Sequence, residues 1–230
     1  MKIGILCAGD REAAPFFPMI ENGREMQKAM LRFCEGSIEN MDVVVLYSGV
    51  CKVNAAIATQ ILIDTFRCDA IINAGTAGAM AEELDVLDTV VSAEVAYHDV
   101  AEGILTEFHP WMESIWFKAD GHLLKIARKT AQAIGDNRKN VFGRMVTGEQ
   151  FIEDDNRAEI NAGFAPLSVD METAAIAHVC HVNGVPFIAV RTITDTPDHR
   201  GAAAFEENCT AASVISAGFV REMLARMTRK

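Results

Sequence analysis

Short segments that are apolar at successive positions place the strongest constraint on how this chain folds. They are rich in Val, Ile and Leu and occupy residues 2–7, 42–48, 69–74, 88–96, 141–146 and 187–194. Continuous apolarity, as opposed to alternation at every second residue, indicates strands that are covered on both faces. Helical patterns lie between these strands, at residues 53–66, 121–135, 153–162, 171–183 and 205–228. The alternation of strand and helix predicts an α/β fold with a largely parallel sheet.

The chain is long enough to bury one complete hydrophobic core. Of its 230 residues, 50% are hydrophobic, and no internal repeat, low-complexity segment or linker divides them. We therefore expect one domain over residues 1–230. No apolar run reaches the roughly 18 residues of a membrane span, and the N-terminal segment lacks the features of a signal peptide. These features predict a soluble cytoplasmic protein without a membrane partner.

Charge and cysteine usage exclude several classes of protein. Lys and Arg total 21 against 32 Asp and Glu, which gives a formal net charge of -11, and no cluster of five basic residues occurs. Nucleic-acid binding is disfavoured, because neutralising phosphates needs positive charge gathered on one face. The six cysteines are scattered without a CxxC pair, so we expect reduced core residues.

Carboxylates gather at the expected carboxyl ends of the strands, where ligands bind in open α/β sheets. The segments that follow the strands are AGDRE (8–12), SGVCK (48–52), AGTAGAM (74–80), TGEQFI (147–152), VDMET (169–173) and TDTPD (194–198). Three of these segments could bring carboxylates to one pocket, namely Glu12, the pair Asp170 and Glu172, and Asp195. Each of these residues, taken alone, is better explained as a helix-start charge, a cap or a turn.

Two strings look like nucleotide-binding motifs without matching them. AGTAGAM is not GxGxxG, and its Gly75 and Gly78 indicate close packing or unusual backbone angles instead. Lys52 follows a glycine turn as P-loop lysines do, but the GxxxxGK[ST] spacing is missing. We expect Lys52 to be a loop or ion-pair residue.

The strings taken together, and their order, resemble one known family. MKIGILCAGDRE, SGVCKVNAA, DAIINAGTAGAM, AYHD, FKAD, TGEQFI, VDMETAAIAHVCHVNGVPF and VRTITD run almost the whole length of the chain. They are similar to the nucleoside phosphorylase/nucleosidase superfamily, and most similar to its methylthioadenosine/S-adenosylhomocysteine nucleosidase branch. The resemblance implies a three-layer α/β/α sandwich around a mixed, largely parallel sheet. It also implies a homodimeric hydrolase that uses no metal or organic cofactor and releases adenine from 5′-substituted adenosines.

The resemblance assigns a role to each matching position. Glu12 would activate the attacking water, and Asp195 would protonate N7 of adenine. The ribose hydroxyls would be held by Glu172 and its neighbour Met171, with Thr76 standing where the family usually has Ser. The remaining contacts would be stacking of Phe151 on adenine, pairing of the Ile152 backbone with the adenine edge, and covering of the 5′ side by Phe205.

The chemistry explains why two carboxylates are needed. Breaking an N-glycosidic bond builds positive charge on the ribose and negative charge on the departing base. Asp195 must therefore be held protonated by burial or by a neighbouring carboxylate, whereas Glu12 must be ionised to accept a proton from water. Opposed protonation of two carboxylates is the logic of inverting glycoside hydrolysis.

Two alternative functions stay open at this point. A phosphorylase of the same fold would need cationic phosphate ligands, and superfamily phosphorylases commonly have an arginine where this chain has Asn73. The Gly9-Asp10 pair resembles the first loop of the phosphorylases, and Arg11 could meet an anion, although we expect it to pair with carboxylates. A non-catalytic nucleoside-binding protein would not need Glu12 and Asp195 together.

Other residues receive supporting roles. His178 and His181 have the i, i+3 spacing of metal ligands, but the matching family segment is a packing helix, so we expect no metal. His98-Asp99 is interpreted as support for the pocket and interface. The irregular segment 99–116, with both tryptophans, is our candidate for a subunit contact near the neighbouring pocket. The preferred 5′ substituent, and any ligand contact of Asp170, stay open.

Overall fold

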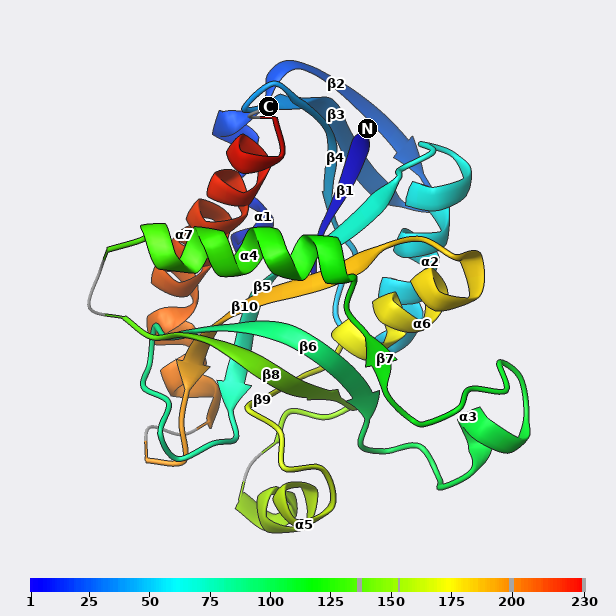
Figure 1. The fold of residues 1–230 in the computed structure, drawn as a ribbon. Coiled ribbons are helices and arrows are strands. Elements are labelled where there is room, and N and C mark those ends of the chain that lie inside the picture. Colours follow the sequence, from blue (N-terminus) through cyan, green and yellow to red (C-terminus); the bar gives the residue numbers. More distant parts are fainter. Residues whose placement is uncertain (136–137, 153, 199–200, 229–230) are drawn as a thin grey trace.

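The computed structural model describes residues 1–135, 138–152, 154–198 and 201–228. Among these residues, ten strands form one sheet (Figure 1). The strands are β1 (Lys2–Cys7), β2 (Glu21–Lys28), β3 (Leu31–Ile38), β4 (Met41–Tyr47), β5 (Ala70–Ala79), β6 (Thr89–Tyr97), β7 (Phe117–Lys118), β8 (Asn140–Thr147), β9 (Ser168–Asp170) and β10 (Phe187–Asp195).

Seven of these strands form two parallel groups that run in opposite directions, and β2, β3 and β7 are added by antiparallel pairing. The first group is β4, β1, β5 and β10, and the second is β6, β8 and β9. Antiparallel pairing of β10 with β6 and of β5 with β9 joins the groups. The strands β5, β10, β6, β8 and β9 therefore pair in a closed circuit, so that segments far apart in the sequence meet around its interior.

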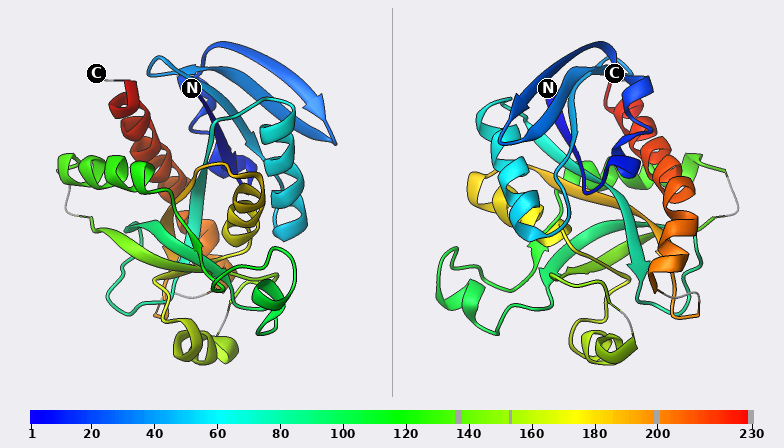
Figure 2. Two further views of the ribbon diagram at one scale, coloured as in Figure 1. Left: turned by 45° about the vertical axis from the view of Figure 1, so that its right-hand side comes forward. Right: turned by 180° about the vertical axis from the view of Figure 1, so that it is seen from behind.

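Helices cover the sheet on both sides, as the two views of Figure 2 show. One face is covered by α2 (Lys52–Asp64) and α6 (Thr173–Asn183), and the other by α1 (Asp10–Ala13), α4 (Gly121–Ala133) and α7 (Gly201–Thr228). Each face buries its own apolar cluster, in which residues such as Leu62 and Val220 are fully covered. Burial of one such side chain stabilises the fold by about 1.5–3 kcal/mol. The predicted three-layer α/β/α sandwich is confirmed.

The remaining elements lie at the edges of the sandwich. They are the short helices α3 (Ile104–Glu107) and η1 (Phe17–Met19), and α5 (Asp154–Phe164), which lies beside β9. The segment around α3 projects from the body of the molecule in Figure 1. All six cysteines are free, and four of them are buried. In the part of the chain that the structure describes, no helix has the length and apolarity needed to cross a membrane.

The β2–β3 hairpin is absent from the predicted elements. All eight residues of Glu21–Lys28 are exposed, and this strand is held by pairing with β3 instead of by burial. Because its sequence, ENGREMQK, has no apolar pattern, periodicity cannot reveal it. The last helix also begins at Gly201 and not at residue 205.

Candidate active site

All eight residues assigned a role from the sequence line one cavity of about 380 Å³. This volume lies within the range of small-molecule sites. The eight predicted residues come from six separate segments of the chain, and they are Glu12, Thr76, Phe151, Ile152, Met171, Glu172, Asp195 and Phe205. The convergence of these residues on one cavity is a finding of the structure.

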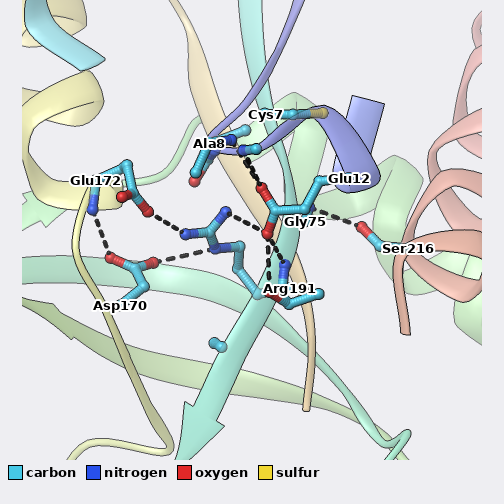
Figure 3. A network of polar contacts seen from close by, with 12 residues as sticks. Cys7, Ala8, Glu12, Gly75, Asp170, Glu172, Arg191 and Ser216 are labelled. Carbon is cyan, nitrogen blue, oxygen red and sulfur yellow. Dashed lines mark hydrogen bonds and ion pairs between the residues drawn. The ribbon is translucent and has the colours of Figure 1, made fainter. Parts of the chain in front are cut away.

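Glu12 lies on α1, directly after β1, and is almost completely buried. Its Oε2 accepts hydrogen bonds from the backbone amides of Ala8 (2.7 Å) and Gly9 (3.0 Å). Its Oε1 accepts from the amide (2.7 Å) and the hydroxyl (2.8 Å) of Thr76. These four hydrogen bonds fix the orientation of the Glu12 carboxylate at the edge of the cavity. Figure 3 shows this carboxylate facing the side chain of Arg191.

Two glycines of β5 let the carboxylates approach the strand. A Cβ atom on Gly75 would lie 2.4 Å from Oε1 of Glu12, and one on Gly78 would lie 2.8 Å from Oδ2 of Asp195. Gly75 also has a φ of +151°. The register of β5 with β10 places Gly75 opposite Arg191 and Gly78 opposite Asp195. The predicted close packing at these glycines is confirmed, and it serves the two carboxylates.

Arg191 is the centre of the polar network in Figure 3 and was not predicted as a site residue. It is 1% exposed, and it faces three carboxylates. Its Nη2 donates to Oε2 of Glu172 (2.8 Å), its Nε donates to Oδ2 of Asp170 (3.2 Å), and its Nη1 lies 3.9 Å from Oε1 of Glu12. Nη1 has no hydrogen-bond partner among the described residues. One signal was present in the sequence, since an arginine within the apolar run FIAVRTIT needs buried partners.

Asp170 is engaged by the protein itself. Its Oδ1 accepts from the hydroxyl of Thr147 (2.6 Å) and from the amides of Glu172 (3.1 Å) and Thr173 (3.0 Å). Its Oδ2 accepts from Arg191 and from the Thr173 hydroxyl. With both oxygens used in this way, Asp170 orients Arg191 and the start of α6.

Glu172 directly precedes α6, and each of its two carboxylate oxygens accepts a hydrogen bond from a different donor. Its Oε1 accepts from the Cys51 amide (2.9 Å), and its Oε2 accepts from Arg191. Burial raises the pKa of Glu172 above its usual value; Arg191 opposes the rise, and the charges of Asp170 and Glu12 add to it. Glu172 can therefore exchange a proton near neutrality.

Asp195 ends β10 on the opposite side of β5 from Glu12. It is buried, and the hydroxyl of Thr194 donates to its Oδ1 (2.8 Å). Burial raises the pKa of Asp195 above its usual value, although Thr194 and Arg157 act in the opposite direction. A carboxyl group that holds its proton more tightly than usual is suited to act as an acid.

The apolar walls of the cavity come from the loop after β8 and from α7. The rings of Phe151 and Phe205 meet edge to face with their centroids 6.4 Å apart. Phe151 is 42% exposed, whereas Ile152 is buried. An aromatic face at the mouth of the cavity and an apolar floor can receive a flat heterocycle.

The residues behind the alternative functions are bound by other protein groups, although Arg11 itself lines the cavity. Arg11 forms a bidentate pair with Glu206 (2.8 and 2.9 Å), so it pairs with a carboxylate as expected, although not with one of its sequence neighbours. Asn73 is not one of the described residues that line the cavity. Its side-chain amide donates to the Leu6 carbonyl and accepts from the Thr173 hydroxyl.

Lys52 and His178 have the ion-pair and packing roles that the sequence predicts. Lys52 forms ion pairs with Asp99 and Glu149. His178 stacks on Phe117 with ring centroids 5.1 Å apart, which is a packing role. Of the described residues that line the cavity, none belongs to segment 99–116.

Comparison with known proteins gives a consistent result. The family model of the phosphorylase superfamily matches residues 2–225. The 5′-methylthioadenosine/S-adenosylhomocysteine nucleosidase of Actinobacillus succinogenes is 40% identical over 232 residues, which cover 99% of this chain and 100% of that protein.

Two solved structures resemble the fold along its whole length. The nucleosidase of Colwellia psychrerythraea in complex with adenine has a TM-score of 0.90 at 34% identity, covering 98% of this chain and 95% of that chain. An aspartate-to-asparagine variant of the Helicobacter pylori nucleosidase, with 5′-methylthioadenosine in its active site, has a TM-score of 0.89 at 27% identity and covers 98% of both chains.

Proposed function

Because this chain belongs to the phosphorylase superfamily and, within it, to the 5′-methylthioadenosine/S-adenosylhomocysteine nucleosidases, we infer that it hydrolyses N-glycosidic bonds of 5′-substituted adenosines. The products are adenine and a 5′-substituted ribose. We propose that Glu12 and Asp195 carry out the two proton transfers, and that Thr76, Phe151, Ile152, Met171, Glu172 and Phe205 bind the substrate.

The single observation that favours water over phosphate as nucleophile is the charge around Arg191. This one buried guanidinium faces the carboxylates of Glu12, Asp170 and Glu172. Their charges more than cancel that of Arg191, so a phosphate dianion brought to this point would meet net negative charge in a site of low dielectric constant. Water carries no such penalty.

The departing base receives its proton from Asp195. With adenine against Phe151 and Ile152, the raised pKa of Asp195 lets its carboxyl donate a proton to N7 as the bond between N9 and C1′ breaks. The bonding electron pair moves onto the base, and the proton makes the leaving adenine neutral.

The attacking water is activated on the other side of the sugar. We place it between Glu12 and Nη1 of Arg191, where it would satisfy the free Nη1 donor. Its oxygen bonds to C1′ while Glu12 accepts one of its protons. Glu172, held by the Cys51 amide and by Arg191, is positioned to accept hydrogen bonds from ribose hydroxyls beside Met171.

Release of adenine with and without phosphate tests this function. The protein is incubated with 5′-methylthioadenosine in a phosphate-free buffer and with added phosphate, and free adenine is followed. We expect equal rates. A requirement for phosphate would identify a phosphorylase, and binding of adenosine derivatives without release would identify a nucleoside-binding protein.

We further propose that the enzyme is a homodimer. The segment that contains α3 exposes Ile104, Phe108 and Trp111, and nearby exposed apolar side chains of this kind mark interaction surfaces. A second copy seated there could also close the 5′ side of the neighbouring cavity. Sedimentation equilibrium tests this proposal, since a monomer at micromolar concentration would contradict it.

The compartment and pathway follow as proposals. Six free cysteines fit the reducing conditions of the cytoplasm. Acting on methylthioadenosine there, the enzyme would supply methylthioribose for methionine salvage.

A further inference from the structure

The loop that carries the adenine-binding residues is a thin wall between two cavities. Gln150 and Ile152 line the active-site cavity and also line a second cavity of about 370 Å³. The second cavity is polar and acidic, with Asp99, Glu149 and Glu159 among its lining residues. Ile152 at the end of the loop packs in a small apolar cluster with Val146 and Ile160, whereas the loop before it is held by polar contacts.

Apart from the Gly148 amide, which donates to the Asp170 carbonyl (3.1 Å), the polar anchors described for this loop converge on Lys52. The Lys52 ammonium donates to both oxygens of Asp99 (2.9 Å each), and Oδ2 of Asp99 accepts from the backbone amide of Glu149 (2.9 Å). The Glu149 side chain in turn accepts from the Lys52 amide (3.2 Å). Phe151 follows Glu149 by two residues. The three residues Lys52, Asp99 and Glu149 form a closed set of contacts, which we name the Lys52 clamp.

The Lys52 clamp is partly shielded from water, which strengthens it beyond an ordinary surface ion pair. The side chains of Lys52 and Asp99 are 20% and 28% exposed, and Lys52 lies 5.3 Å from the centre of the Tyr97 ring. Burial raises the pKa of Asp99, but the hydrogen bonds from Lys52 and the Glu149 amide outweigh it, so this pKa lies below its usual value. Charge-assisted bonds in such surroundings are stronger than neutral ones.

The Lys52 clamp also lies next to Glu172, the carboxylate that we propose to bind the ribose hydroxyls. Lys52 begins α2, and the residue before it, Cys51, donates its amide to Glu172. Two adjacent residues therefore hold two parts of the site. Cys51 holds Glu172, and Lys52 holds the loop 148–152 through Asp99. No atom of Lys52 lines the active-site cavity, so Lys52 does not touch the reacting atoms.

We propose that Lys52 is a positioning residue that fixes the loop 148–152 through Asp99 and Glu149 and thereby sets the affinity of the site for adenine. This inference rests on the proposed function, because it takes Phe151 and Ile152 as the adenine-binding residues. It assigns to Lys52 an effect on binding of the base and not on the chemical step.

The test compares Lys52→Met with a matched control. Lys139→Met removes a lysine that also bridges two carboxylates, those of Asp85 (3.0 Å) and Asp88 (3.7 Å), and Lys139 lines neither cavity. Adenine binding is measured by calorimetry, and KM and kcat are measured with 5′-methylthioadenosine. We expect Lys52→Met to weaken adenine binding and raise KM about tenfold each, with kcat changed less than about threefold. Lys139→Met should leave all three unchanged.

A conservative variant and a second position complete the design. Lys52→Arg should recover most of the adenine affinity, because the charge is kept. If Lys52→Met does not fold, Asp99→Asn takes its place, with weaker adenine binding expected in the same direction. Unchanged adenine affinity in the folded variant, or a kcat loss equal to the KM increase, would overturn the proposal. The two proposals can fail separately. If the wild-type protein binds adenine but releases none from nucleosides, only the proposed function is contradicted, because the role of Lys52 is tested by adenine affinity.

Discussion

Replacing Arg191 by methionine is expected to destabilise the protein in a pH-dependent way. The substitution keeps an unbranched chain of similar length and removes the only cation that contacts Glu12, Asp170 and Glu172 among the described residues. Two of these contacts are hydrogen-bonded ion pairs, at 2.8 and 3.2 Å. Breaking a buried ion pair by removing one partner costs about 3–5 kcal/mol, because the remaining charges are left uncompensated.

The pH dependence follows from Glu172. Burial raises its pKa and Arg191 opposes the rise, so the pKa of Glu172 rises further in Arg191→Met. A folded pKa above the unfolded value means that the folded state binds the extra proton, and stability is lost as the pH rises through the folded pKa. The slope is about 1.4 kcal/mol per pH unit for one proton. Because the wild-type pKa of Glu172 already lies at about 7, the two proteins diverge only above that pH, and we expect the destabilisation to be about 1 kcal/mol larger at pH 8 than at pH 6.

Urea unfolding at fixed protein concentration measures both quantities. The matched control is Arg32→Met, which breaks the exposed ion pair of Arg32 with Glu25 and should cost less than about 1 kcal/mol. The reasoning would be refuted if Arg191→Met lowered the free energy of unfolding by less than about 1 kcal/mol at pH 8, or lowered it more at pH 6 than at pH 8.

Three further perturbations test individual contacts. Asp195→Asn should slow adenine release by about 10²–10⁴-fold while calorimetry shows nucleoside binding retained; a kcat within threefold of wild type would exclude Asp195 as the acid. Thr194→Val should move the basic limb of the kcat profile to higher pH, because Thr194 lowers an Asp195 pKa that burial raises and activity is lost as the pH rises through this pKa. A limb that moves to lower pH would contradict this. Cys51→Gly should raise the free energy of unfolding by about 1 kcal/mol, since Cys51 has φ 81° and ψ 165°, a backbone region suited to glycine, and an equal gain in Cys51→Ala would rule out strain as the cause.

The core of the fold was accessible from the sequence because it depends on burial. The run at residues 2–7 coincides with β1, and the pattern at 53–66 corresponds to α2, Lys52–Asp64. Both elements bury continuous apolar surface, which is the property that periodicity detects. The hairpin strand Glu21–Lys28 depends on backbone pairing with β3 and buries no side chain, so its sequence carries no corresponding signal.

The site was partly accessible for a different reason. Glu12, Glu172 and Asp195 follow or end predicted strands, and the order of the family's strings indicated their roles. The closed circuit of strands, which brings Arg191 into contact with the carboxylates, depends on pairings between remote segments that one sequence does not encode locally. Arg191 could be recognised as a charge that needs partners, but its partners required the structure.

Hydrolysis in ¹⁸O-labelled water tests the central claim most directly. The wild-type enzyme converts 5′-methylthioadenosine in labelled water that also contains phosphate, and the sugar product is analysed by mass spectrometry. If Glu12 activates water beside Arg191, the sugar gains one ¹⁸O atom at C1′ and no phosphate. A sugar 1-phosphate without the label would contradict the account.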